Sequence, residues 1–236
     1  MQQKWKTAFL ITALLGLTNY AICQSTIQFK MMFNNQAFHK DSSYTNSAGE
    51  TVQIHRFMFY TTKWKLITAT NDTIPLSNDH FLINVEKEAT MLLPFNKLTN
   101  AKKIMFDVGV DSIRNTTGIQ TGILDPAIGM FWTWRTGYIM AKMHGFSPQA
   151  KTAGNRFSYE VGGFQSPYNS VRTIVLELPT RTEKNKLFTI KTNLAHWFNG
   201  KHIIQIGTSP NCHNAGKLAM QLADNYASMF SIHSNN

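Results

Sequence analysis

Hydrophobic and polar residues alternate along much of this chain in short runs that end at polar, glycine or proline residues. The run at 171–178 is a clear example, because Ile174, Leu176 and Leu178 share one face of an extended strand while polar or β-branched residues share the other. Runs of this kind are typical of β-strands. They predict ten strands, at 27–33, 52–60, 64–69, 80–85, 103–108, 137–144, 156–161, 171–178, 186–192 and 202–206.

Strands at this spacing predict an all-β fold, one antiparallel β-sandwich with Greek-key connections. The segment 193–200 begins with a good N-cap residue and ends with glycine, which predicts a short helix. The segment 216–230 places Leu218, Leu222 and Tyr226 on one stripe and predicts a C-terminal helix packed on the sandwich. No repeat or shift in composition marks a second domain, so we expect a single domain over 24–236.

The first residues predict export. Lys4 and Lys6 precede an apolar run at 8–17 that is too short to cross a bilayer, and residues suited to cleavage follow it. We expect a signal peptide over 1–23, cleavage before Gln24, and a periplasmic or secreted protein without a membrane span. Lipidation of Cys23 is disfavoured because a bulky residue stands directly before it, where a small one is required.

Two bulk properties narrow the function further. Cleavage leaves Cys212 as the remaining cysteine, so an intrachain disulfide is excluded and this thiol is either buried or reactive. The formal charge is +10, and it falls to +8 when Lys4 and Lys6 are removed. Because charged residues are only 15% of the chain and form no basic run, the sequence does not predict a nucleic-acid partner.

The alternating pattern breaks between residues 107 and 134, in a long stretch that is rich in turn residues. It contains four glycines and the oxygen-bearing side chains of Asp107, Asp111, Asn115 and Asp125. Such a long irregular segment in a compact domain is usually functional or disordered, and its glycines and aromatic residues favour order. The oxygen atoms could hold a calcium ion, or they could shape the loop as turns and caps, which the absence of EF-hand spacing favours.

The sequence carries no motif of a familiar catalyst. There is no G-x-S-x-G elbow, H-E-x-x-H helix or P-loop. Cys212 and His213 are neighbours in sequence, but adjacency alone does not orient an imidazole toward a thiol. We therefore expect that the protein is not an enzyme.

A metal site is a stronger candidate, since the mature chain keeps all eight histidines and many methionines. Imidazole combined with thioether suits copper, whereas imidazole alone suits zinc or copper. No two histidines stand at a metal-ligand spacing, so a site would have to assemble from distant strands. The alternative is that they are surface or hydrogen-bonded histidines, at positions 39, 55, 80, 144, 196, 202, 213 and 233.

Trp132 and Trp134 lie at the end of the long loop. Because they are two residues apart, they are predicted to face the same side of an extended strand. They could belong to the core or form a stacking surface for sugars. A native indole is a poor metal ligand, but oxidative opening of its ring gives kynurenine, whose amine and ketone can bind copper.

The stretch GVDSIRNTTGIQTGILDPAIGMFWTWRTGYIMAKMHG at 109–145 resembles the MbnP-like family, named for copper-binding partner proteins encoded with methanobactin genes. The resemblance continues in the segments 57–66, 162–173, 194–200 and 222–230, and it is greatest to the single-domain branch of Bacteroidetes-type bacteria. It implies an exported β-sandwich with a copper site, in which a dihaem partner enzyme of the MbnH/MauG kind oxidises a tryptophan to kynurenine. It also implies a calcium ion in some members.

This chain departs from the family pattern at two positions. It has Glu160 where the resembling family has a histidine, and His144 where that family has a glutamate. Such an exchange is expected if the two side chains lie opposite each other on neighbouring strands. We expect a polar pair beside both tryptophans, and the candidate metal-site residues are Trp132, Trp134, His144 and Glu160, with His213 as a more remote ligand.

A rival hypothesis from another class is an extracellular recognition module. In that case the aromatic loop binds a glycan or a partner protein, the tryptophans stay chemically intact, and no metal is needed.

Overall fold

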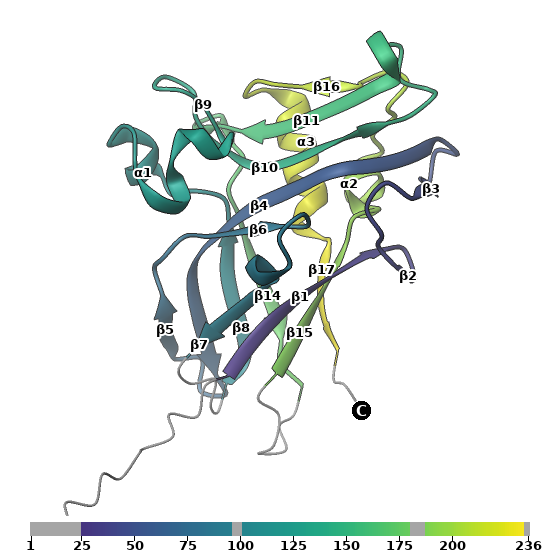
Figure 1. The fold of residues 1–236 in the computed structure, drawn as a ribbon. Helices are drawn as coiled ribbons and strands as arrows, with labels where there is room; N and C mark the ends of the chain where they lie inside the picture. Colours follow the sequence, from purple (N-terminus) through teal and green to yellow (C-terminus); the bar gives the residue numbers. More distant parts are fainter. Residues whose placement is uncertain (1–24, 96–100, 180–186, 234–236) are drawn as a thin grey trace, which may run out of the picture.

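The fold is organised around β4 (Thr51–Thr68), a strand of 18 residues that crosses the whole molecule (Figure 1). The structure is a computed structural model, and it describes residues 25–95, 101–179 and 187–233. The signal peptide expected over 1–23 lies outside the described residues. Within them, no helix is long and apolar enough to cross a bilayer.

β4 is the centre of a ten-stranded sheet with the order β14-β8-β4-β10-β11-β16, onto which four short strands pair. The other strands of this sheet are β3 (Ser43–Thr45), β5 (Thr73–Ser77), β6 (Phe81–Asn84), β8 (Ala101–Val108), β9 (Phe131–Thr133), β10 (Gly137–Phe146), β11 (Arg156–Gly162), β14 (Arg172–Glu177) and β16 (Asn211–Cys212). A five-stranded sheet contains β1 (Ser25–Phe33), β2 (Gln36–Ala37), β7 (Leu92–Phe95), β15 (Leu187–Asn193) and β17 (Phe230–His233). β12 (Phe164–Gln165) and β13 (Tyr168–Asn169) form a separate hairpin.

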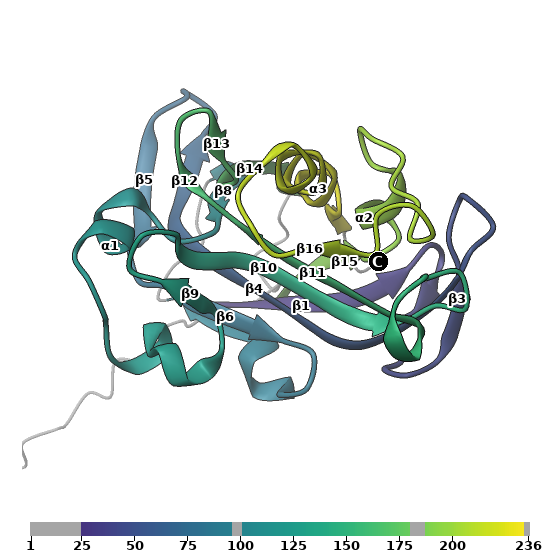
Figure 2. The same ribbon diagram turned by 90° about the horizontal axis from the view of Figure 1, so that it is seen from above.

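Helical structure is sparse. It consists of α1 (Ser112–Thr116), α2 (His196–Asn199), α3 (Lys217–Ala227) and four 3₁₀ turns at Glu88–Met91, Gly122–Leu124, Pro126–Ile128 and Ala153–Asn155. Seen from above, α2 and α3 lie on one side of β10 and β11, whereas β9 lies on the other side and α1 lies near the start of β10 (Figure 2). The fold is therefore mostly β, as the sequence predicts.

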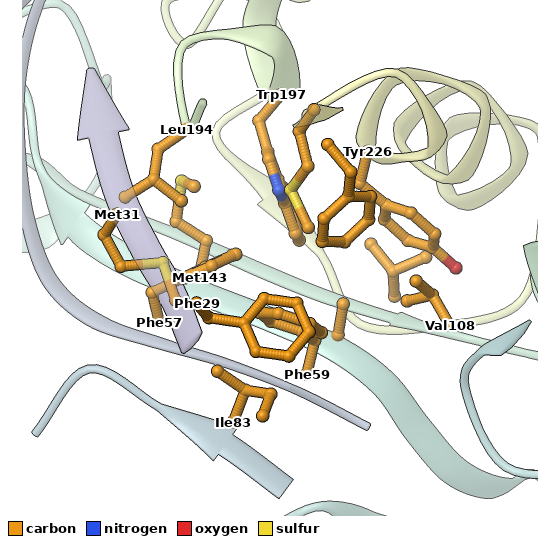
Figure 3. Close-up of a cluster of buried hydrophobic side chains, with 14 of the residues drawn as sticks. Phe29, Met31, Phe57, Phe59, Ile83, Val108, Met143, Leu194, Trp197 and Tyr226 are labelled. Carbon is orange, nitrogen blue, oxygen red and sulfur yellow. The ribbon is translucent and has the colours of Figure 1, made fainter. Parts of the chain in front are cut away.

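The main core is strongly aromatic and lies between the two sheets and α3 (Figure 3). Phe29 meets Phe59 edge-on with ring centroids 5.6 Å apart, and Trp64 stacks on Phe106 at 4.3 Å. Trp197 and Tyr226 bring α2 and α3 into the same cluster, and both are fully buried. A second, smaller cluster that includes Tyr60, Tyr138 and Met140 lies beneath the long loop at 109–131.

Most predicted strands are confirmed, and the differences have physical causes. The predicted strands 52–60 and 64–69 are one strand. The polar residues between them do not end β4, because the strand continues through a register shift at Lys63, whose φ is +52°. The predicted strand 202–206 is wrong. Ile203 is 75% exposed and forms only an isolated bridge with Asn199, while the next isoleucines turn into the core.

The two predicted helices form but are shorter than expected. Asn193 accepts a hydrogen bond from the Ala195 amide, so a turn precedes α2 and the helix begins at His196. α3 ends at Ala227, and Phe230 starts β17 instead of completing the helical stripe. Antiparallel pairing prevails, but β1 with β15 and β11 with β16 pair in parallel.

Candidate metal centre

Adjacent strands β10 and β11 place a set of polar side chains on one face of the large sheet. Lys142 pairs with Glu160 in the ladder, and His144 pairs with Ser158. Successive residues of a strand point to opposite faces, so these four share a face while Met143 enters the core. The prediction that His144 lies directly opposite Glu160 is wrong by two residues, yet diagonal neighbours on one face remain in reach.

Glu160 is the hub of this cluster. Its Oε2 accepts a hydrogen bond of 2.9 Å from the indole N–H of Trp132. Its Oε1 lies 3.0 Å from Lys142 Nζ and 3.2 Å from His144 Nε2. The His144 Nε2 atom is buried and lacks a well-directed hydrogen bond, so the imidazole nitrogen faces the carboxylate without being fully satisfied by it.

These neighbours set the charge of the carboxyl. Burial by itself raises the pKa of Glu160, but the neighbouring His144 imidazole, Trp132 indole N–H and Lys142 side chain outweigh it and lower the pKa to about 2. Lys142 is only 6% exposed and also donates to the carbonyl of Gly129, which ties β10 to the end of the long loop. The carboxyl of Glu160 is therefore ionised at neutral pH, and the buried side chain of Lys142 lies beside it.

Trp132 reaches this carboxylate because β11 has a glycine beneath it. A Cβ atom placed on Gly162 would lie 2.6 Å from Cζ3 of the indole, too close for any other residue without displacement of the ring. Trp132 is partly buried and packs against the second hydrophobic cluster. The absence of a side chain at Gly162 thus lets the indole approach β11 closely, with its N–H directed to Glu160.

His213 lies at the rim of the same face. β16 runs parallel to β11, and the residue after it brings His213 Nε2 to 2.7 Å from Ser158 Oγ. Ser158 is the ladder partner of His144, so both imidazoles flank one serine. In the described part of the chain, no three His, Cys, Asp or Glu side chains converge tightly enough to hold a metal ion.

Trp134 is separate from this cluster. β9 ends at Thr133, so Trp134 lies in the following turn. The prediction that both tryptophans face the same side of one extended strand is therefore wrong. Its side chain is 65% exposed, and its ring lies over Gly118 of the loop. Of the two tryptophans, only Trp132 lies beside His144 and Glu160.

The oxygen-bearing side chains of the long loop have separate partners. Asp111 caps α1 by accepting from the Arg114 amide at 3.0 Å, and Asp125 caps a 3₁₀ turn by accepting from the Ala127 amide at 2.8 Å. Asp107, on β8, accepts from the Thr173 hydroxyl at 2.6 Å. These contacts are those of turns and caps, which shape the loop, and calcium binding stays a prediction.

Among the four oxygen-bearing side chains of the loop, Asn115 makes the most hydrogen bonds to the backbone. It is 4% exposed, its amide donates to the carbonyls of Val110 and Asp111, and its carbonyl accepts from the Tyr138 amide at 2.8 Å. These bonds fix the loop to the start of β10. The loop is ordered, as the sequence predicts, and contains α1, two 3₁₀ turns and β9.

Cys212 is buried, which decides between the two expectations for this thiol. It is 3% exposed, and burial raises its pKa to about 11. A thiol in this state is a poor nucleophile at neutral pH.

Sequence reasoning did not single out Lys142 and Ser158. The signal for Lys142 was a cation within the otherwise apolar strand YIMAKM, on the same face as His144. Ser158 carried no such signal, because its role depends on the arrival of β16 beside β11.

With this geometry established, the family can be assigned. The sequence model of the family described as MbnP matches residues 23–214. The chain belongs to the MbnP family. This membership associates it with the copper-related proteins of methanobactin systems.

Comparison of structures agrees on the fold of this family member. MbnP from Methylosinus trichosporium is similar with a TM-score of 0.60 at 13% sequence identity, over 90% of this chain and 99% of that one. At this identity, the likeness concerns the fold alone. No curated protein sequence matches the chain.

Proposed function

We propose that this MbnP-family protein is an exported copper-binding protein, not a catalyst, and that Trp132 is the residue that a dihaem partner enzyme converts to kynurenine. The single observation that carries the proposal is the hydrogen bond of 2.9 Å from the Trp132 indole N–H to Glu160, beside His144. This contact connects Trp132, from the tryptophan motif of the resemblance, with Glu160 and His144, the two positions at which this chain departs from the family pattern.

The native side chains supply part of a copper site. The imidazoles of His144 and His213 are suitable donors, and the buried Nε2 of His144 lacks a well-directed hydrogen bond. Glu160 can add a carboxylate oxygen, although Lys142 at 3.0 Å competes with any cation for it. An indole is not a useful donor, so the native set is weak and a modified Trp132 would complete it.

Conversion of Trp132 would add the missing donors. Cleavage of the indole ring by an oxidant such as a peroxide-charged dihaem centre inserts oxygen, and hydrolysis then releases the former ring carbon as formate. The product gains one oxygen and loses one carbon relative to tryptophan, and it carries an aryl amine and a ketone. In Trp132, the nitrogen that becomes this amine already points to Glu160.

The environment favours Trp132 over Trp134 for this reaction. When an indole loses an electron its N–H becomes acidic, and an ionised carboxylate in hydrogen-bond contact can take the proton. Glu160 provides that acceptor for Trp132. The structure gives Trp134 no such contact among the described residues, and its ring is largely in water.

The test is copper binding after co-expression with a MauG-type dihaem oxidase. Wild-type protein, Trp132→Phe and Trp134→Phe are purified with and without the oxidase and titrated with copper. We expect tight, stoichiometric binding only for oxidase-treated wild type and Trp134→Phe. Equal copper binding by Trp132→Phe would contradict the proposal.

A second variant separates ligand loss from misfolding. His144→Gln keeps a polar side chain at a position that is partly exposed, and should leave the near-ultraviolet circular dichroism unchanged while weakening copper binding at least tenfold. An unchanged copper affinity in a folded His144→Gln protein would remove His144 from the site.

The recognition module remains the second candidate, because the loop carries several exposed large apolar side chains. Ile113 is 70% exposed, Ile119 is 53% exposed, and both belong to the same loop as Trp134. Exposed large apolar side chains mark a binding surface when they form one contiguous patch. A glycan array probed with wild type and Trp134→Ala in the presence of a chelator tests this function, and binding that depends on Trp134 without metal would support it.

A further inference from the structure

A groove of about 590 Å³ opens at the edge of the five-stranded sheet, and none of the candidate metal-site residues line it. It arises from an interruption in the pairing of β1. β7 pairs with β1 over Ser25–Gln28, and β2 pairs with it at Met32 and Phe33. The three residues between them, 29–31, have no strand beside them on this edge.

The exposed edge offers backbone groups to a ligand. The carbonyl of Met31 points into this edge, since it accepts from the Phe38 amide at 3.0 Å. Residues two apart in a strand direct their N–H and C=O groups to the same side. The N–H and C=O of Phe29 therefore face the groove, between the ends of the two flanking strands.

The walls of the groove are apolar. Phe38, Val85 and Met91 line it, and each is partly buried against the main core. A volume of this size falls in the range of sites for small organic ligands, about 300–1,000 Å³. The groove can therefore hold the apolar part of a small ligand. The open edge of β1 spans only three residues, which is too short to pair with a long peptide strand.

The rim of the groove is positive. Lys30 is exposed and, in the described part of the chain, forms no ion pair. Lys40 also lies at the rim and is shared between Asp41 and Glu86, each at 3.6 Å. Lys30 therefore supplies the uncompensated positive charge at the rim, and with a formal charge of +8 after removal of residues 1–23 the rim favours an anionic group over a metal cation.

We propose that this groove binds a small amphipathic organic anion. The apolar body lies against Phe38, Val85 and Met91, and the acid group meets Lys30 and the Phe29 amide at the open edge of β1. The site is independent of copper, because it shares no residue with the candidate metal centre.

The probe for this site is 1-anilinonaphthalene-8-sulfonate, an aromatic anion whose fluorescence rises in apolar surroundings, compared with N-phenyl-1-naphthylamine, which lacks the sulfonate. Lys30→Gln removes the proposed counter-charge. Lys151→Gln is the matched control, since Lys151 is exposed in the loop between β10 and β11 and does not line the groove. Ala37→Trp fills the groove from an exposed position of β2.

We expect the sulfonate to bind the wild type and the Lys151→Gln protein equally, to bind Lys30→Gln about fivefold to tenfold more weakly, and to lose binding in Ala37→Trp. The neutral probe should bind wild type and Lys30→Gln alike. Each protein must show the same near-ultraviolet circular dichroism. No binding by the wild type, equal sulfonate binding by Lys30→Gln and Lys151→Gln, or unchanged binding by folded Ala37→Trp would overturn the proposal.

Discussion

Replacement of Glu160 by glutamine tests the electrostatics of the candidate centre. The pKa of this carboxyl falls from 4.5 to about 2, and a tenfold change in proton affinity corresponds to about 1.4 kcal/mol, which gives an upper limit of about 3 kcal/mol. The side chain is 19% exposed, and solvent screening reduces the expected effect to about 2 kcal/mol. Glu160→Gln also leaves the ammonium of Lys142 without its counter-charge, so the free energy of unfolding should fall by about this amount at pH 7.

The pH dependence follows from the direction of the pKa change. A carboxyl whose pKa is lowered in the folded state contributes stability that is complete above the unfolded-state pKa and is lost as the pH falls through the folded-state pKa. The stabilisation by Glu160 is therefore complete above about pH 5 and declines toward pH 2. The difference between wild type and Glu160→Gln should shrink over that window.

Urea unfolding at pH 7, 5, 4 and 3, followed by circular dichroism, measures this difference. Glu177→Gln is the matched control, because Glu177 is 63% exposed and pairs with Lys103 at the surface, where an ion pair contributes at most about 1 kcal/mol. A difference for Glu160→Gln below about 0.5 kcal/mol at pH 7, or one that stays constant down to pH 3, would refute the reasoning.

Three further substitutions or reactions test other parts of the structure. Gly162→Ala should lower the free energy of unfolding by about 1–3 kcal/mol and shift the tryptophan fluorescence, since its Cβ would lie 2.6 Å from the Trp132 ring. Gly216→Ala is the control in the same urea titration: it has open space around it and should leave the tryptophan fluorescence unchanged, with a cost of at most about 1 kcal/mol because alanine is a poorer N-cap of α3 than glycine. Asn115→Ala should cost about 2–3 kcal/mol and speed amide exchange at 111–117, and unchanged exchange would show that other contacts hold the loop. In the mature chain, Cys212 should react with a thiol reagent at pH 8 far more slowly in the native state than in urea, because burial raises its pKa to about 11, and equal rates would show that it is accessible.

Alternation in the sequence was sufficient to predict most strands, because it reports which side of a strand is buried. At 172–177, Ile174 is buried while Thr173 and Val175 are exposed, as the pattern indicates. The same pattern could not show that β4 continues through Lys63. There a single residue with a positive φ breaks the alternation, but the strand does not end. The prediction of a strand at 202–206 was wrong because Ile204 and Ile206 are buried from a segment of turns and irregular backbone, without strand pairing.

The sequence predicted which residues belong to the candidate site better than it predicted how they are arranged. His144, Glu160, His213 and Trp132 do gather on one face, but the register that places Lys142 opposite Glu160 depends on long-range pairing that a single sequence does not encode locally. Trp134 was grouped with Trp132 because the two were assigned to one strand. The turn that follows Thr133 separates them, and only tertiary structure shows it.

The mass of the tryptic peptide at 115–135, which contains both tryptophans and ends at Arg135, tests the proposed oxidation of Trp132. Protein co-expressed with a dihaem oxidase is digested, and fragment ions assign any change to one residue. We expect the gain of one oxygen and loss of one carbon at Trp132, together with bound copper, and an intact Trp134. The same change at Trp134, or copper bound with both tryptophans intact, would contradict it.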